Sequence, residues 1–230
     1  MISENLSEVR NNIKKACEKV GRDVKEVTLI AVSKTKPASD IEVAYENDIR
    51  NFGENKVQEI GDKYPVLPKD IKWHLIGHLQ TNKVKYIIDK VHLIHSVDSV
   101  HLAEQIEKEA VKRNVDMDIL IQVNVAEEDT KFGLKTEETI NIIKEISKFP
   151  HVHIKGLMTI APFTDVAEEN RIYFRNLKVL SDEISELNIP NVEMKELSMG
   201  MTGDYEVAVE EGATLVRVGT AIFGNRNYNK

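Results

Sequence analysis

Short β-rich runs alternate with longer amphipathic stretches along almost the whole chain of 230 residues. This alternation is typical of repeated βα units, which build a parallel sheet. Eight runs qualify as strands, and eight parallel strands with intervening helices close into a (β/α)8 barrel of the TIM type, an α/β fold. The predicted strands are residues 27–33, 49–52, 73–76, 93–96, 119–125, 154–158, 192–197 and 215–218.

An extra helix precedes the first strand. The residues Leu6, Val9, Ile13, Cys17 and Val20 have the spacing of one helix face. Free cysteine usually packs as a small hydrophobic residue, so Cys17 is predicted to lie in the core. The further predicted helices are residues 40–47, 55–64, 79–89, 99–114, 136–148 and 204–211.

The helix after Thr164 has the clearest predicted start. Asp165 and Glu168 have the spacing of a capping box, and Pro190 marks the end of the helix. Its predicted buried stripe has helical spacing and consists of Tyr173, Leu177, Leu180, Ile184 and Leu187.

Composition limits the function classes. The net charge is -7, with both signs mixed along the chain, which does not favour a nucleic acid or an anionic membrane as partner. No apolar run approaches the roughly 20 residues that span a bilayer, and no signal peptide is recognisable. The single cysteine excludes an internal disulfide. We therefore expect one soluble, cytoplasmic domain over residues 1–230, without a linker.

Lys34 directly follows the first predicted strand, and Pro37 then directs the chain into an extended exit. Residues after the strands of such a barrel form its active face. Desolvation lowers the pKa of an ammonium group, and the neutral amine forms a Schiff base with an aldehyde. An isolated lysine at this position is more often a solvated side chain, so the rest of the barrel mouth decides its interpretation.

Two glycine-rich loops follow the seventh and eighth predicted strands, at 198–204 and 217–224. Loops at these two positions are the usual phosphate site of a barrel, because glycines let a ligand approach backbone N–H groups and hydroxyl groups donate hydrogen bonds. Each loop alone is a modest signal, since glycine-rich turns are common. Together the two loops predict a phosphate site beside Lys34.

Polar residues also follow the second and third strands. Asn55 either points into the mouth or caps a helix, and His78 either lines the mouth or has a structural role. His74 and His78 have helical i, i+4 spacing, but Gly77 breaks the helix that a metal site would need. His151 and His153 have strand spacing, without a carboxylate at a ligand offset. No metal site is expected.

An aldehyde for Lys34 and a phosphate for the two loops describe pyridoxal 5'-phosphate. The sequence also resembles the pyridoxal phosphate homeostasis proteins, a family related to the barrel domain of alanine racemase. The strings that carry the resemblance are AVSKTKP at 31–37, NFGENKVQE at 51–59, WHLIGHLQTNK at 73–83, QVNVAEEDTKFGL at 122–134, GLMTI at 156–160 and ELSMGMTGDYEVAVEEGATLVRVGTAIFG at 196–224.

The resemblance implies roles for seven residues. Lys34 is expected to form the Schiff base, Arg217 to face the pyridine nitrogen, and Asn55 to lie near the ring. The resemblance gives no role to Glu54, Lys131 and Met158. The residues expected to hold the phosphate are Ser198, Thr202, Gly219 and Thr220.

The resemblance implies a monomer, or a weak oligomer, that stores pyridoxal phosphate or delivers it to apo enzymes. An arginine beside the pyridine nitrogen keeps that nitrogen unprotonated, which weakens the ring as an electron sink. We therefore expect a homeostasis protein without robust catalysis, and no second domain to supply a racemase tyrosine. Two alternatives remain. They are a pyridoxal phosphate-dependent racemase or decarboxylase, and a cofactor-free aldolase or phosphosugar binder.

Overall fold

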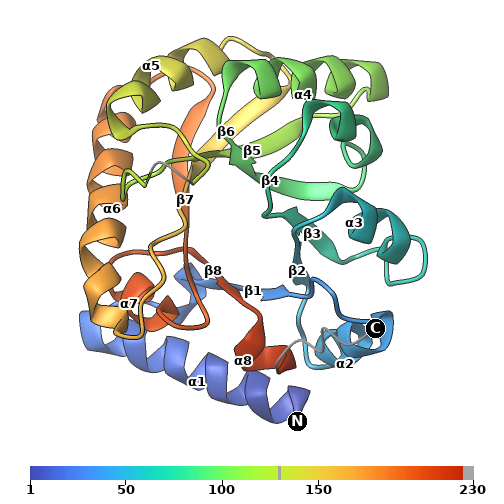
Figure 1. The fold of residues 1–230 in the computed structure, drawn as a ribbon, viewed down its shortest axis with the longest axis vertical. Coiled ribbons are helices and arrows are strands. Elements are labelled where there is room, and N and C mark those ends of the chain that lie inside the picture. Colours follow the sequence, from blue (N-terminus) through green and yellow to red (C-terminus); the bar gives the residue numbers. More distant parts are fainter. Residues whose placement is uncertain (129–130, 225–230) are drawn as a thin grey trace.

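The computed structural model describes residues 1–128 and 131–224. Its eight strands form one closed barrel in the order of the sequence, and every neighbouring pair is parallel. Figure 1 shows the strands as a ring with the helices outside it. The strands are β1 (Thr28–Val32), β2 (Asn51–Glu54), β3 (Lys72–Leu75), β4 (Val91–Val97), β5 (Met117–Gln122), β6 (Val152–Met158), β7 (Val192–Met201) and β8 (Leu215–Val218). The predicted barrel is confirmed.

The helices cover the outside of the barrel (Figure 1). Residues 129–130 and 225–230 lie outside the described part of the chain. The α-helices are α1 (Ile2–Val20), α2 (Ala38–Glu46), α3 (Val57–Lys63), α4 (Val100–Arg113), α5 (Thr136–Ile146), α6 (Arg171–Glu186), α7 (Tyr205–Glu210) and α8 (Thr220–Phe223). The 3-10 helices are η1 (Val24–Glu26), η2 (Thr81–Tyr86) and η3 (Ala167–Asn170).

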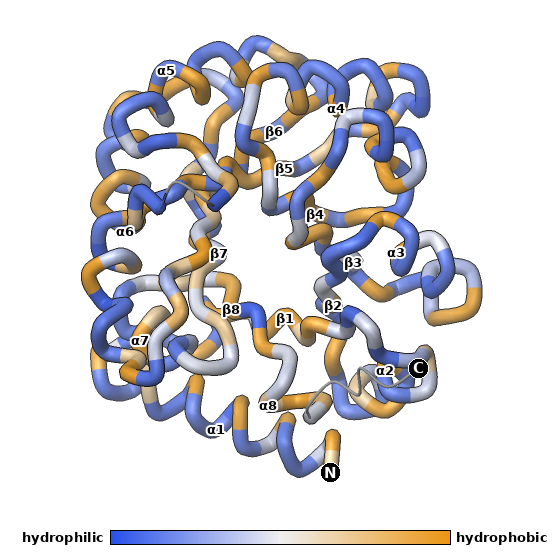
Figure 2. Tube along the Cα trace, in the orientation of Figure 1, coloured by the Kyte–Doolittle hydropathy of each residue, from blue (hydrophilic) through white to orange (hydrophobic). Residues whose placement is uncertain are grey.

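The extra N-terminal helix α1 is confirmed and packs against α7 and α8. Its buried face includes Leu6, Val9, Ile13 and Cys17, whereas Val20 is exposed because the helix ends there. Figure 2 shows hydrophobic and hydrophilic residues alternating along α1, as expected for a helix with one buried face. The prediction that Cys17 is a core residue is confirmed.

Two separate sets of apolar side chains make the core. The larger cluster fills the space between the strands and the helices. The smaller cluster consists of Ile30, Leu93, Leu120, Met158 and Leu215, which come from five different strands. Inward-pointing residues of a barrel fill its interior, so this cluster is the plug beneath the mouth.

The predicted helix at 79–89 is wrong, because η2 occupies this region instead. Val84, the buried residue of η2, and Ile87, the buried residue directly after η2, are three positions apart, which is the spacing of a 3-10 helix. The backbone bond from Ile87 N to Val84 O has the same i, i+3 spacing. Apolar residues over one short turn cannot distinguish the two kinds of helix.

The predicted capping box of Asp165 and Glu168 is also wrong. The Thr164 hydroxyl accepts from Val166 N and bonds Glu169, so it organises the start of η3, and α6 begins only at Arg171. Glu168 pairs instead with Arg171.

The predicted stripe of α6 is confirmed for its central members. Leu177, Leu180 and Ile184 are buried, and Tyr173 is partly buried against the core. Leu187 is exposed, because α6 ends one residue before it, and Phe174 is buried as well.

A glycine in β6 allows two strands to approach. A Cβ atom on Gly156 would lie 1.8 Å from the backbone oxygen of Glu196 in β7. Gly156→Ala should therefore lower the free energy of unfolding by about 3 kcal/mol or more, because backbone atoms must move to relieve the overlap. Denaturant unfolding followed by circular dichroism measures this loss.

Gly61→Ala is the matched control. Gly61 lies in α3 with no neighbouring atom within 4 Å of an added Cβ. This substitution should raise stability by roughly 0.5–1 kcal/mol, since alanine is a better helix former. Equal effects of the two substitutions would contradict the close approach of β6 and β7.

Candidate functional site

A cavity of about 860 Å³ opens at the C-terminal ends of the strands. Its size lies within the usual range of small-molecule sites. Six of the seven predicted site residues line it: Lys34, Asn55, Thr202, Arg217, Gly219 and Thr220. The seventh, Ser198, lies elsewhere. The fold thus brings together residues that are up to 186 positions apart in the sequence, from 34 to 220.

Lys34 stands on a tight turn directly after β1. The turn is closed by a hydrogen bond of 3.0 Å from Lys36 N to Ser33 O. Thr35 has a φ of 65°, which is unusual for a β-branched residue and indicates a strained backbone. Lys34 itself is half-buried and lines the cavity. The strained turn therefore places a lysine at the barrel mouth, as the sequence predicts.

The loops after β7 and β8 meet at the Thr202 hydroxyl. Its Oγ1 atom accepts hydrogen bonds from Gly219 N at 3.3 Å and from Ala221 N at 3.5 Å. Two backbone N–H groups thus converge beside a hydroxyl group at the edge of the cavity. An added Cβ on Gly219 would lie 3.3 Å from the backbone oxygen of Val32. This close approach holds the second loop against the end of β1.

Asp204 fixes the shape of the first loop. Its Oδ1 atom accepts from Met201 N at 2.7 Å, and its Oδ2 atom accepts from Asn170 Nδ2 at 2.8 Å. Both Asp204 and Asn170 are buried and line the cavity. These hydrogen bonds preorganise the loop, so its shape is set before a ligand binds.

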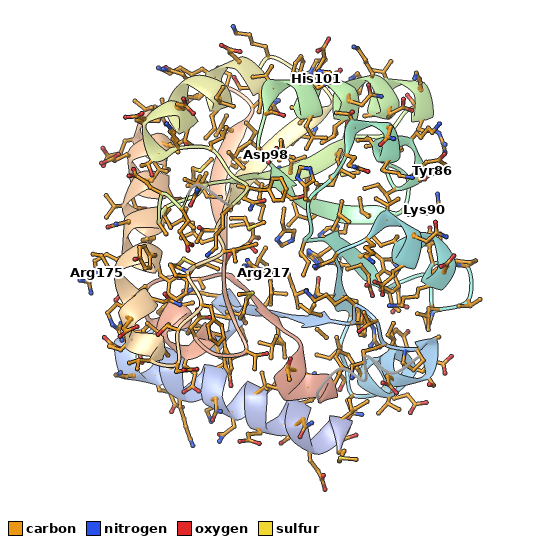
Figure 3. All side chains as sticks on the ribbon, viewed as in Figure 1. Tyr86, Lys90, Asp98, His101, Arg175 and Arg217 are labelled. Atoms are coloured by element: carbon orange, nitrogen blue, oxygen red, sulfur yellow. The ribbon has the colours of Figure 1, made fainter. Side chains whose placement is uncertain are left out.

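Arg217 lies on the floor of the cavity, inside the ring of strands. Figure 3 shows it there, while Arg175 points away from the barrel. The guanidinium group donates to Ser198 Oγ at 2.5 Å and to the backbone oxygen of Thr159 at 2.8 Å. Burial lowers the pKa of Arg217 to about 10, against the opposing effect of Asp204. The group therefore carries its positive charge at neutral pH.

Ser198 does not line the cavity, unlike the other six predicted site residues. The strand β7 extends to Met201, beyond its predicted end at residue 197, so Ser198 lies within the strand and pairs with Met158 and Leu215. It is fully buried, and its hydroxyl contacts Arg217 and His95. Ser198 is therefore a partner of Arg217, and the structure does not place it with the phosphate loops.

A chain of polar groups continues from Ser198 across the barrel interior. His95 Nδ1 lies 2.8 Å from Ser198 Oγ, His95 Nε2 lies 2.9 Å from His74 Nδ1, and His74 Nε2 lies 2.9 Å from Asn51 Oδ1. One donor order satisfies every member: Arg217 donates to Ser198, Ser198 to His95, His95 to His74, and His74 to Asn51. This order requires both histidines to be neutral.

The electrostatics of the interior agree with that order. Burial lowers the pKa of His74 to about 3, and burial together with the nearby His74 and Arg217 lowers the pKa of His95 well below its usual value. Sequence reasoning missed His95 entirely. The one available signal was a polar residue at an inward position of a buried strand.

The opposite wall of the cavity comes from the loops after β2, β3 and β5. Asn55 does not cap a helix, since Lys56 is the residue before α3 and makes no side-chain cap. The His78 ring stacks on Phe132 with centroids 3.9 Å apart. His78 therefore lines the cavity. No group of three or more His, Cys, Asp or Glu side chains suited to a metal exists among residues 1–128 and 131–224.

The comparisons with known proteins agree with this geometry. The family model described as "Alanine racemase, N-terminal domain" matches residues 5–227. A protein of Aquifex aeolicus named "Pyridoxal phosphate homeostasis protein" is 47% identical, over 98% of both chains. The protein of the same name from Escherichia coli K12 is 35% identical, over 100% of this chain and 98% of its own. This chain belongs to the pyridoxal phosphate homeostasis protein family.

Solved structures support the same assignment to the family. The PipY protein of Synechococcus elongatus is 36% identical and superposes with a TM-score of 0.87 without pyridoxal phosphate and 0.84 with it bound, over 97% of this chain and 100% of PipY. Alanine racemase of Clostridium difficile is 17% identical with a TM-score of 0.74, and this chain spans 57% of it. This second likeness shows a shared fold. Within the described part of the chain, no helix has the length and hydropathy to cross a membrane.

The buried histidines predict acid sensitivity. A histidine with a depressed pKa in the folded state contributes stability above its unfolded pKa of about 6.5, and this contribution is lost as the pH falls further. For His74 the loss should extend from pH 6.5 towards about 3, at up to about 1.4 kcal/mol per pH unit. Urea unfolding at a series of pH values measures this slope.

Two histidine substitutions test whether the buried network controls the acid stability. His74→Gln should reduce the slope, because glutamine binds no proton. His101→Gln should leave the slope unchanged, since His101 is exposed on α4, as Figure 3 shows. A slope that does not respond to His74→Gln would mean that the interior histidines do not control the acid stability.

Proposed function

We propose that this chain binds pyridoxal 5'-phosphate, holds its aldehyde carbon as a Schiff base on Lys34, and serves to store or deliver the cofactor. One observation carries the proposal. The Lys34 amine and the hydroxyl and N–H groups of the loops after β7 and β8 line the same cavity. This pairing matches a ligand with an aldehyde at one end and a phosphate at the other. The relative PipY has been solved with pyridoxal phosphate bound.

The residues of the cavity fit each part of this cofactor. Lys34 would supply the amine, and Arg217 would face the ring nitrogen from the floor. Asn55 lines the cavity and would lie near the ring. The phosphate would be held by Thr202, Thr220 and the backbone N–H groups of Gly219 and Ala221. Ser198 supports this set from below by orienting Arg217.

A homeostasis role follows from the charge of Arg217. Bound pyridoxal phosphate supplies an electron sink for carbanions, and this sink is strongest when the ring nitrogen is protonated. The buried cation Arg217 disfavours that proton, because like charges repel in a low dielectric. Robust racemase or decarboxylase activity is therefore not proposed. We expect a cytoplasmic monomer that passes the cofactor to apo enzymes.

One test of the proposed function concerns the attachment site. Borohydride reduces a Schiff base to a stable amine, so treatment of the purified protein with pyridoxal phosphate and borohydride should attach the cofactor irreversibly to Lys34. Lys34→Ala should abolish this fixation without unfolding the barrel. Peptide mass spectrometry locates the modified lysine. Lys36→Ala is the matched control, because Lys36 Nζ donates to the backbone oxygen of Phe223 at 2.8 Å, away from the proposed role. Fixation that persisted in Lys34→Ala at Lys36 would move the attachment by two residues.

The second prediction concerns the phosphate. In a Lys34→Ala background, Thr202→Val should weaken equilibrium binding of pyridoxal phosphate by about tenfold or more, since a hydrogen bond to a charged group contributes roughly 1.5–3 kcal/mol. Binding of phosphate-free pyridoxal should change much less. Titration followed by absorbance measures both affinities.

Thr164→Val is the control for the phosphate prediction. Thr164 also lines the cavity, but its hydroxyl bonds Glu169 and not the loop after β8. It should have the same small effect on both ligands. If Thr202→Val weakened both ligands equally, Thr202 would support only the loop, and the phosphate assignment would fail.

A further inference from the structure

A buried cluster of charged residues lies behind the turn that carries Lys34. It consists of Glu54 at the end of β2 and of Glu59 and Lys63 on α3, and we call these three residues the turn clamp. Lys63 Nζ lies 2.7 Å from Glu54 Oε1 and 2.9 Å from Glu59 Oε2. Glu54 is fully buried and Lys63 nearly so. Buried ions are costly, so such a cluster is usually kept for a specific structural purpose.

The turn clamp holds both neighbours of Lys34. On one side, Ser33 Oγ donates to Glu54 Oε1 at 2.7 Å, and Ser33 O accepts from Lys63 Nζ at 2.9 Å. On the other side, Thr35 N donates to Glu59 Oε2 at 2.7 Å. The three acceptors around Lys63 use all three protons of its ammonium group. The hydrogen bonds on both sides of Lys34 are therefore linked to the same cation, Lys63.

The pKa values of the two carboxyl groups of the turn clamp are shifted in opposite directions. Burial raises the pKa of Glu54 to about 7, although Lys63 and the Ser33 hydroxyl act to lower it. Burial also acts to raise the pKa of Glu59, but the hydrogen bonds from Thr35 and Lys63 outweigh it, and the net shift is downward. Near neutral pH, Glu59 thus supplies the negative charge that Lys63 needs. Glu54 Oε2 has no hydrogen-bond partner among the described residues.

The turn needs such support, because the positive φ of Thr35 is strained and persists only where its surroundings hold it. The hydrogen bond from Thr35 N to Glu59 is the contact that holds this residue. We propose that Glu54, Glu59 and Lys63 are positioning residues, which keep the Lys34 turn in the geometry that its amine needs to attack the cofactor aldehyde. This inference rests on the proposed function and gives Glu54 a specific role within it.

The first test needs no cofactor. Glu59→Ala should raise hydrogen exchange at the Thr35 amide of the apo protein at least tenfold, because this amide loses its acceptor. Glu59→Gln keeps an acceptor oxygen and should restore most of the protection. NMR or peptide-resolved mass spectrometry measures the exchange. Unchanged exchange at Thr35 in Glu59→Ala would overturn the proposed anchor.

The second test measures the rate at which pyridoxal phosphate becomes fixable by borohydride at Lys34. Glu59→Ala and Lys63→Met should each slow this step by about tenfold. In the Lys34→Ala background, the same changes should alter the equilibrium affinity for the cofactor by less than twofold. Lys69→Met is the matched control, since Lys69 is exposed and its ammonium group contacts the backbone oxygen and the ring of Tyr64. It should leave the rate unchanged.

The outcomes separate the two proposals. If wild-type protein is never fixed at Lys34, the proposed function fails and this inference fails with it. If wild type is fixed and the folded Glu59→Ala variant is fixed at the same rate, only the role of the turn clamp is overturned. A parallel loss of rate and of equilibrium affinity would also overturn it, because the cluster would then support the cavity as a whole. Should Lys63→Met fail to fold, the partly exposed Glu59 gives the decisive variant.

Discussion

Pairing between the first and the last strand of the barrel is the constraint on which the site depends. Ala31 of β1 lies opposite Val218 of β8, and this register closes the sheet. The same pairing brings the turn of Lys34 beside the loop of Gly219, where a side chain on Gly219 would crowd the backbone oxygen of Val32. Without closure, the Lys34 amine and the loop amides would stand at opposite edges of an open sheet. Since the barrel has no free edge, their separation is fixed by the strand register.

A second constraint is the burial of the Arg217 cation in the barrel interior, where its guanidinium group needs hydrogen-bond partners. Each hydrogen-bonding group that is buried without a partner costs free energy. A directional chain of hydrogen bonds provides the partners: it runs from Arg217 through Ser198, His95 and His74 to Asn51. These five residues come from five different strands. The orientation of Arg217 is thereby set by residues that do not line the cavity.

Outside the barrel wall, the turn clamp plays a comparable part for Lys34. Here the charged groups bond Ser33 and Thr35, the two neighbours of Lys34. The two polar networks have no residue in common: one contacts Arg217, and the other contacts the turn of Lys34. The stacked pair of His78 and Phe132 belongs to the opposite wall of the cavity. Hydrogen-bonded support for Arg217 and for the turn of Lys34 suits the proposed binding of a cofactor.

The sequence by itself determined the order of the elements, the closed barrel and the two ends of the site. Alternating β-rich and amphipathic runs carry that information locally, because the buried face of each element repeats with a fixed period. Lys34 and the loops containing Thr202 and Gly219 were recognisable because a barrel always presents its strand ends at one face. Family resemblance added Asn55, Thr220 and Arg217 to them.

Only the tertiary structure decided how these residues are supported. Ser198 was expected at the phosphate, but β7 continues past it and turns its hydroxyl towards Arg217. The contacts of His95 with Ser198 and of Lys63 with Ser33 join residues 103 and 30 positions apart. Such hydrogen bonds depend on strand register and on which side of the sheet a residue faces. Local periodicity does not specify either pairing. The partner of a polar residue inside a buried strand is therefore known only from the closed barrel.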